Sequence, residues 1–191
     1  MGFIHTLERI HDGVFNTLEQ ALGPWFLPLA ARLVFSSVLL MFFINSGLTK
    51  VGTGFPDFLI PAAGAYAQIL PSIMEAAEYD VDQIALFPWK LIVLGGTYAE
   101  FALPVMLLLG IFTRLTSVGF IGFIIVMSFV DIQFHGLEPE SIGAMFDRIH
   151  NSIIFDQRLL WVFPLIYLAI KGDGPISVDA LILRRFSGQA R

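Results

Sequence analysis

Cysteine is absent from the 191-residue sequence, and charged residues are scarce. The lack of cysteine excludes disulfides, thiol catalysis, iron–sulfur clusters and thiolate zinc sites. Charged residues make up 14% of the chain, whereas soluble domains carry roughly 25%, so the polar surface is too small for a soluble protein. Basic stripes interleaved with aromatic residues are also missing, and the net charge is −5, which argues against nucleic acid as a partner. Phosphate-binding glycine loops and HExxH metal helices are absent too.

Long hydrophobic runs dominate what is present, since 56% of the residues are hydrophobic and the mean hydropathy is +0.76. A helix needs about 20 apolar residues to cross a bilayer. The sequence therefore predicts an all-α polytopic membrane protein, in which one membrane domain forms a four-helix transmembrane bundle. The predicted spans are residues 28–50, 91–112, 115–134 and 157–170. The apolar run of the fourth span is short, so we expect this helix to extend backwards and its outer end to be covered by protein.

The basic residues predict the orientation of the bundle. Four spans place both termini and the turn at Arg114 on one side, which holds seven Lys and Arg residues against four on the other. Excess Lys and Arg mark the cytoplasmic side. We therefore expect both termini, including the tail at 171–191, to be cytoplasmic.

The first 24 residues precede the spans and have neither a basic n-region nor a cleavage signature, so a signal peptide is not expected. Their apolar residues fall on one helical face: Phe3, Leu7, Ile10, Val14 and Leu18. Residues 1–24 should form an amphipathic helix. The helix would lie along the inner membrane interface or pack on a partner subunit, and the pattern fits both interpretations.

Two outer segments, residues 51–90 and 135–156, separate the spans. The first is long and rich in Pro, Gly and Ala. The second contains apolar residues at helical spacing, namely Ile142, Met145, Phe146, Ile149 and Ile153. This spacing predicts an amphipathic helix that covers the outer mouth of the bundle.

One carboxylate, Glu100, stands in the middle of a hydrophobic stretch. It follows Lys90 by ten residues, or about 15 Å of helix, which is close to half of the hydrocarbon thickness. An ionised carboxylate there costs at least ~2.5 kcal/mol, so Glu100 should face the bundle interior, carry a proton or have a partner. Pro104 has no N–H to donate to the Glu100 carbonyl. The side chain and the free carbonyl of Glu100 should therefore form a polar pocket in the middle of the membrane helix.

Polar residues near the outer ends of the spans could surround Glu100. The candidate ligand-binding residues are Asn45, Lys50, Tyr98, Asp131, His135 and Arg158. They predict an outward-facing polar funnel with Glu100 at its base, where it could relay protons. The Tyr98 ring could stack on a quinone, although aromatic residues near span ends also form the interfacial belt.

Two other interpretations of these polar residues stay open. The first is a hydrogen-bond network that holds the helices in register and binds nothing. The second is a metal site formed by His135 and His150 with Asp131 and Asp147. Nothing in their spacing demands a metal, so none is assigned.

Three sequence motifs stand in order over roughly residues 28–182. The first, "RLVFSSVLLMFFINSGLTKVG", resembles the first span of the DoxX family, which closes with Gly-x-x-Lys, here Gly47 to Lys50. "AEFALPVMLLLGIFTRLTSVGF" resembles the second-to-third span junction, with its membrane glutamate at Glu100 and its Gly-x-x-Thr-Arg-Leu turn at 110–115. "GPISVDALI" looks like the closing motif, with Ser177 and Asp179, although its second glycine is missing here.

The resemblance implies a four-helix membrane protein, which we expect in a bacterial inner membrane. The family name is attached to a subunit of a thiosulfate:quinone oxidoreductase, and relatives are linked to oxidative-stress complexes and to the maturation of other proteins. Two hypotheses follow. The chain is a membrane subunit of a redox complex, with quinone as the possible cofactor, or it is a non-catalytic scaffold that grips partner membrane or periplasmic subunits. Without cysteine, a metal signature or a nucleotide loop, the chain needs a bound cofactor for redox chemistry.

Overall fold

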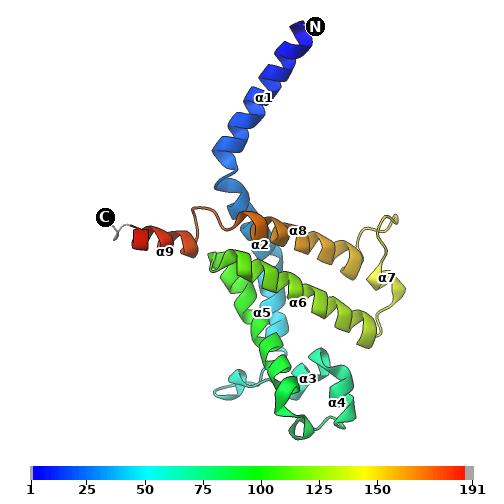
Figure 1. Cartoon of the computed structure of the whole chain (residues 1–191). Helices are drawn as coiled ribbons and strands as arrows, with labels where there is room; N and C mark the ends of the chain where they lie inside the picture. Colours follow the sequence, from blue (N-terminus) through cyan, green and yellow to red (C-terminus); the bar gives the residue numbers. More distant parts are fainter. Residues whose placement is uncertain (1, 188–191) are drawn as a thin grey trace.

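The computed structural model describes residues 2–187, which are mainly helical, with no strand in this range. One isolated antiparallel bridge joins Val51 and Pro61. The α-helices are α1 (Gly2–Leu22), α2 (Phe26–Leu48), α3 (Ala63–Ile69), α4 (Pro71–Ala76), α5 (Leu91–Leu109), α6 (Thr113–Phe134), α7 (Pro139–Ile142), α8 (Leu159–Lys171) and α9 (Val178–Ser187) (Figure 1). Met1 and residues 188–191 of the expected tail lie outside the described range.

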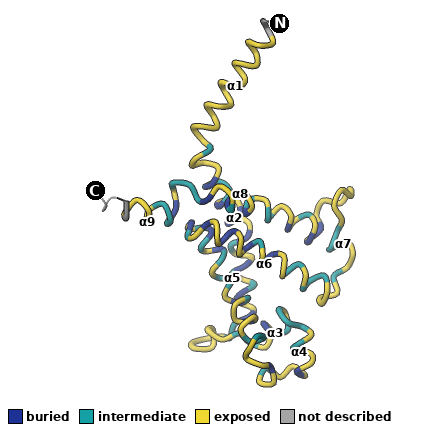
Figure 2. The backbone as a smooth tube through the Cα atoms, in the orientation of Figure 1, coloured by how far each residue is buried: buried dark blue, intermediate teal, exposed yellow. Residues whose placement is uncertain are grey.

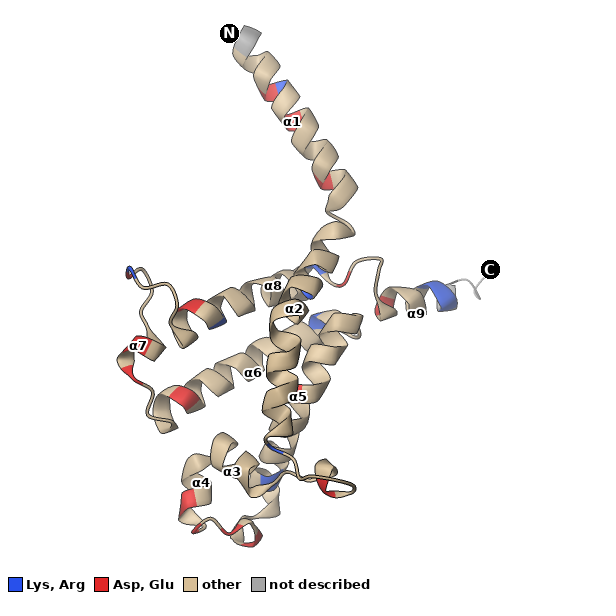
Figure 3. Cartoon of the chain, turned by 180° about the vertical axis from the view of Figure 1, so that it is seen from behind, with Lys and Arg blue, Asp and Glu red and all other residues tan. Residues whose placement is uncertain are grey.

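Within the described residues, four helices are long and apolar enough to cross a membrane, which confirms the predicted fold class. They are Phe26–Leu48, Leu86–Leu109, Thr113–Phe134 and Ile153–Lys171. The fourth span extends backwards as expected, because a π-helical segment, Ile153–Arg158, leads into α8. Ser152 and Asp156 fix this start: the Asp156 amide donates to Ser152 Oγ (3.2 Å), and the Ser152 amide donates to Asp156 Oδ2 (2.8 Å). In the four spans, most charged residues lie near the helix ends, whereas α1 carries charged residues along its length (Figure 3).

The spans form two pairs, α2 with α5 and α6 with α8 (Figure 1). The pairs meet at the end of the bundle near both α1 and α9, which we call the termini end. They diverge toward the opposite end, which carries α3, α4 and α7 and which we call the loop end. Within each pair the helices run antiparallel, and the short turn between α5 and α6 joins the two pairs at the termini end, so the four spans form a V (Figure 1).

Aromatic packing fills the region where the two pairs meet. Phe120 of α6 makes edge-to-face contacts with Phe35 and Phe43 of α2, at centroid distances of 4.9 and 4.8 Å. Leu165 and Leu168 of α8 complete this buried cluster. Edge-to-face pairs add about 0.5–1.5 kcal/mol beyond burial. A second cluster, with Tyr66, Met74 and Val93, holds the first outer segment against α5 at the loop end.

The closing motif, Gly174–Asp179, ties the termini end together. The Asp179 carboxylate accepts hydrogen bonds from the amides of Phe112 (2.9 Å) and Thr113 (3.0 Å), so it caps the start of α6. The buried Arg32 guanidinium of α2 donates to the carbonyls of Leu108 and Ile176. Gly110, in the turn after α5, has a φ of +70°, and a Cβ added there would collide with the side chains of Arg32 and Ser177. The family-like turn and closing motif are thus one structural unit.

The amphipathic helix predicted over 142–153 does not form, and that prediction was wrong. α7 ends at Ile142 because Gly143 takes a left-handed backbone (φ +73°). Phe146 also has positive φ and is fully exposed, while the Asp147 carboxylate accepts from the Ile149 amide (2.8 Å) in a local turn. Residues 143–152 therefore run as an irregular loop.

The predicted N-terminal helix does form, as α1. It projects away from the bundle and its described side chains are exposed on every face (Figures 1 and 2). Whether it lies along a membrane or packs on a partner stays a prediction.

Candidate functional site

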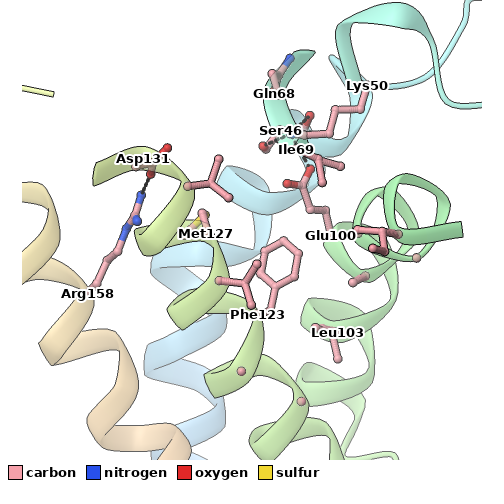
Figure 4. Close-up of a pocket in the computed structure, with 18 of the residues that line it drawn as sticks. Ser46, Lys50, Gln68, Ile69, Glu100, Leu103, Phe123, Met127, Asp131 and Arg158 are labelled. Atoms are coloured by element: carbon pink, nitrogen blue, oxygen red, sulfur yellow. Dashed lines mark hydrogen bonds and ion pairs between the residues drawn. The ribbon is translucent and has the colours of Figure 1, made fainter. Parts of the chain in front are cut away.

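Lys50 and Glu100 form a buried ion pair between α2 and α5. Lys50 Nζ lies 3.0 Å from Glu100 Oε2, and the two residues are only 4% and 5% exposed. Lys50 follows the end of α2, and its side chain folds back along the helix to donate to Ser46 Oγ (2.9 Å) as well (Figure 4). The pair explains how a carboxylate is held inside a hydrophobic helix, since a buried charge needs a partner and hydrogen bonds.

Gly47 allows the two helices to approach closely enough for this pair. A Cβ at Gly47 would lie 2.6 Å from the ring of Phe101, which neighbours Glu100 in α5. A small residue at a helix–helix contact lets backbones approach. The Gly-x-x-Lys motif therefore combines a contact surface for α5 with the cation that Glu100 requires.

A second ion pair lies on the other pair of spans. Arg158, at the start of α8, donates from Nη2 to the carboxylate of Asp131 in α6, and from Nη1 to Ser128 Oγ at 2.9 Å. His135 Nδ1 lies 2.8 Å from Asp131 Oδ1, one turn further along α6. Arg158 is buried, and its Nε has no hydrogen-bond partner among the described residues.

A cavity of about 640 Å³ lies between these two ion pairs. Lys50 and Glu100 line one wall, and Asp131 and Arg158 line the opposite wall (Figure 4). The surface between them is largely apolar and includes Leu103, Phe123, Val126 and Met127. Small residues on two facing helices leave the space open: Gly95, Gly96 and Ala99 on α5, and Gly119 and Gly122 on α6.

The structure brings five of the seven candidate residues to this cavity and leaves two outside it. Those lining it are Lys50, Glu100, Asp131, His135 and Arg158. Asn45 is exposed and does not line the cavity. Tyr98 is also absent from its wall, because its hydroxyl donates to the Leu59 carbonyl (2.8 Å) in the first outer segment.

Sequence reasoning missed three residues that contribute to the site. Gln68 and Ile69 of α3 line the cavity, but they lie in an outer segment whose short helix has no long periodic pattern. Ser128 holds Arg158, and its position three residues before Asp131, on the same helical face, was the available signal.

Of the four residues considered for a metal site, Asp131 and His135 line the cavity, whereas Asp147 and His150 do not. Across residues 2–187, no three His, Asp or Glu side chains are grouped in a way that could hold a metal ion. The Asp131 carboxylate is engaged by Arg158 and His135 instead. The cavity therefore offers paired charges and apolar surface.

Four apolar helices around a cavity with two ion pairs, one of them buried, define an integral membrane protein of the four-helix bundle class. The family model for DoxX matches residues 27–131, more than half of the chain, and the protein belongs to the DoxX family. The match includes the Gly-x-x-Lys motif, Glu100 and the turn after α5. Comparison with curated proteins and with solved structures gave no match.

Proposed function

We propose that this protein is the membrane subunit of a redox complex and that its cavity binds a quinone. The observation that carries the proposal is the cavity itself, where a largely apolar surface lies between one buried and one half-buried ion pair. Its volume falls within the range of about 300–1,000 Å³ typical of small-molecule sites, which are mostly apolar with a few placed polar groups.

The chemistry of a quinone head group fits this lining. Its flat ring is apolar on both faces and carries two carbonyl oxygens on opposite edges. The Phe123 side chain and its aliphatic neighbours offer apolar contact with the ring. Lys50 and Arg158 line opposite walls. Lys50 Nζ already donates to Glu100 and Ser46, so a quinone carbonyl would replace one of these contacts. Arg158 Nε lacks a partner in the described structure. In this proposal each carbonyl accepts a hydrogen bond from one of the two cations.

Glu100 supplies the proton chemistry in this proposal. Reduction of a quinone to a quinol consumes two electrons and two protons. The electrons would come from a partner subunit that carries an electron donor, because the sequence has no cysteine, metal signature or nucleotide loop. Glu100 and Lys50 would pass protons to the nearer carbonyl. Asp131 and His135, which are less buried, would connect the other wall to water at the loop end.

The proposal places the protein in a bacterial inner membrane with both termini in the cytoplasm. The cavity lies toward the loop end, so it would face outward and form the funnel with Glu100 at its base. A lipid-soluble ligand reaches such a site from the bilayer as well, because lipid surrounds the exposed faces of the spans.

A scaffold role is the second candidate, and α1 favours it. This helix buries none of its described apolar side chains against its own chain, since Ile4, Leu7, Ile10, Val14 and Leu18 are all exposed. A helix of this kind needs another surface. The scaffold role predicts that deletion of residues 1–20 releases a partner without altering the bundle.

Quinone content of gently extracted protein tests the redox proposal. We expect close to one quinone per chain in the wild type and a clear loss in Glu100→Gln and in the paired change Lys50→Met with Glu100→Leu. The paired change removes both charges together and so leaves no lone buried charge. Asn45→Leu is the matched control, because Asn45 lies on α2 outside the cavity. Trace quinone that these changes leave unaltered, together with partner loss on truncation, would favour the scaffold.

A further inference from the structure

A second cavity, of about 580 Å³, lies at the termini end, remote in the bundle from the ion-paired cavity. It is formed where the end of α1, the start of α2 and the end of α8 come together (Figure 1). Its wall carries one acid, Glu19, and one base, Lys171, together with the polar side chains of Asn16, Gln20 and Tyr167. Apolar contact is provided by Leu27 and Pro28.

The two charged groups of this cavity are unpaired. Within residues 2–187, neither the Glu19 carboxylate nor the Lys171 ammonium forms an ion pair or a side-chain hydrogen bond. Two other charged side chains at the termini end have partners, since Arg32 donates to backbone carbonyls and Asp179 accepts from backbone amides. Opposite charges that line one cavity without contacting each other can bind the two ends of a zwitterion.

The cavity lies where two of the spans end, which is where the surface of a membrane would be. The first span begins at Phe26, next to the lining residue Leu27, and the fourth span ends at Lys171, which lines the cavity. Trp25 is exposed beside it, with Nε1 held by the Ala21 carbonyl at 2.8 Å. Trp and Tyr concentrate where lipid head groups meet the hydrocarbon, so Trp25 and Tyr167 indicate the same depth. A head group is therefore the zwitterion that this position would encounter.

We propose that this second cavity binds the head group of a zwitterionic phospholipid that carries a primary amine. The Lys171 ammonium and the Tyr167 hydroxyl bind the phosphate, and the Glu19 carboxylate accepts hydrogen bonds from the lipid ammonium. The amides of Asn16 and Gln20 bind the remaining phosphate and ester oxygens. The acyl chains follow the exposed apolar surface of α2, beginning at Leu27. The bound lipid would also join α1 to the bundle.

The proposal predicts a preference among lipid head groups that can be measured. A primary ammonium has N–H donors for Glu19, a choline ammonium has none, and a glycerol head group has no cation. The experiment is native mass spectrometry of the full chain in detergent, with phosphatidylethanolamine, phosphatidylcholine and phosphatidylglycerol added in equal amounts. We expect the ethanolamine lipid to be retained most. Lys171→Gln should lower its retention about fivefold, the factor typical of one lysine near a membrane surface.

Glu19→Gln separates this site from unspecific lipid association. It should reduce the preference for the ethanolamine over the choline lipid while the protein still retains phospholipid. Matched controls are Lys90→Gln and Glu75→Gln, which alter one base and one acid at the loop end and should change nothing. Equal retention of all three lipids, or a preference that survives both Glu19→Gln and Lys171→Gln, would overturn the proposal. So would binding of soluble phosphoethanolamine as tight as that of the lipid, since the chains would then contribute nothing.

Discussion

Lys50 and Glu100, fifty positions apart in the chain, are joined by a buried ion pair with 3.0 Å between Nζ and Oε2. The pair connects α2 to α5 at the wall of the larger cavity. A pair of this kind is expensive to break from one side only, because the remaining charge stays buried without a partner.

We therefore predict that Lys50→Met lowers the free energy of unfolding by about 3–5 kcal/mol. Combining it with Glu100→Leu should recover most of the loss, since an apolar pair of similar size is often neutral. Equilibrium unfolding of Lys50→Met, Glu100→Leu and the double variant in mixed micelles measures the coupling free energy between the two positions. Additive effects of the two single changes would show that the side chains do not interact.

Gly47 gives a prediction about helix packing alone. Gly47→Ala places a methyl group 2.6 Å from the Phe101 ring, and overpacking of this kind costs about 1–3 kcal/mol. The control is Gly95→Ala on α5, where an added Cβ meets nothing within 4 Å. Thermal unfolding should show a lower midpoint for the first variant only. Equal midpoints would mean that α2 and α5 are further apart than described.

Asp179 gives a prediction about the termini end. Because its carboxylate accepts from the Phe112 and Thr113 amides, Asp179→Ala should destabilise the protein by about 0.5–2 kcal/mol, as loss of a helix N-cap does. Asp12→Ala, at an exposed acid of α1, is the control. Amide hydrogen exchange should show faster exchange at the start of α6 in the first variant. Unchanged exchange there would remove the capping role.

The orientation of the bundle predicts two reporter activities. With both termini cytoplasmic, alkaline phosphatase fused after Arg191 should be inactive. The same enzyme inserted between Tyr79 and Gln83, in the first outer segment, should be active. The opposite pattern would reverse the orientation and place the larger cavity on the cytoplasmic side.

Hydrophobic length was sufficient to predict the four spans, because apolar runs of this size have few other structures available. The same reasoning identified Glu100 as a buried group and Lys50 as one of its possible partners. It failed for residues 143–152, where a helical spacing of apolar residues was interrupted by the left-handed backbone at Gly143. Periodicity describes which residues could share a face, and it contains no information about where the chain turns.

The walls of the cavity could be predicted only in part. Asp131 and Arg158 stand near span ends in the sequence, but their contact depends on α6 and α8 being neighbours. Tyr98 lies outside the cavity wall because its hydroxyl donates a hydrogen bond to the Leu59 carbonyl in an outer segment. Contacts of this kind arise from the packing of segments that are distant in sequence, so no single stretch reveals them.

Filling the larger cavity is the most direct test of its role as a binding site. Gly122 of α6 lines it, and an added Cβ would meet nothing within 4 Å, so Gly122→Leu should occupy the space without disturbing the helix contacts. Ile125→Phe is the control on the same helix, where the side chain is exposed and outside the cavity. With equal thermal stability verified for all three proteins, quinone extracted per chain should stay near one in the wild type and in the control and fall to trace levels in Gly122→Leu. Undiminished quinone in Gly122→Leu would contradict the assignment of this cavity as the quinone site.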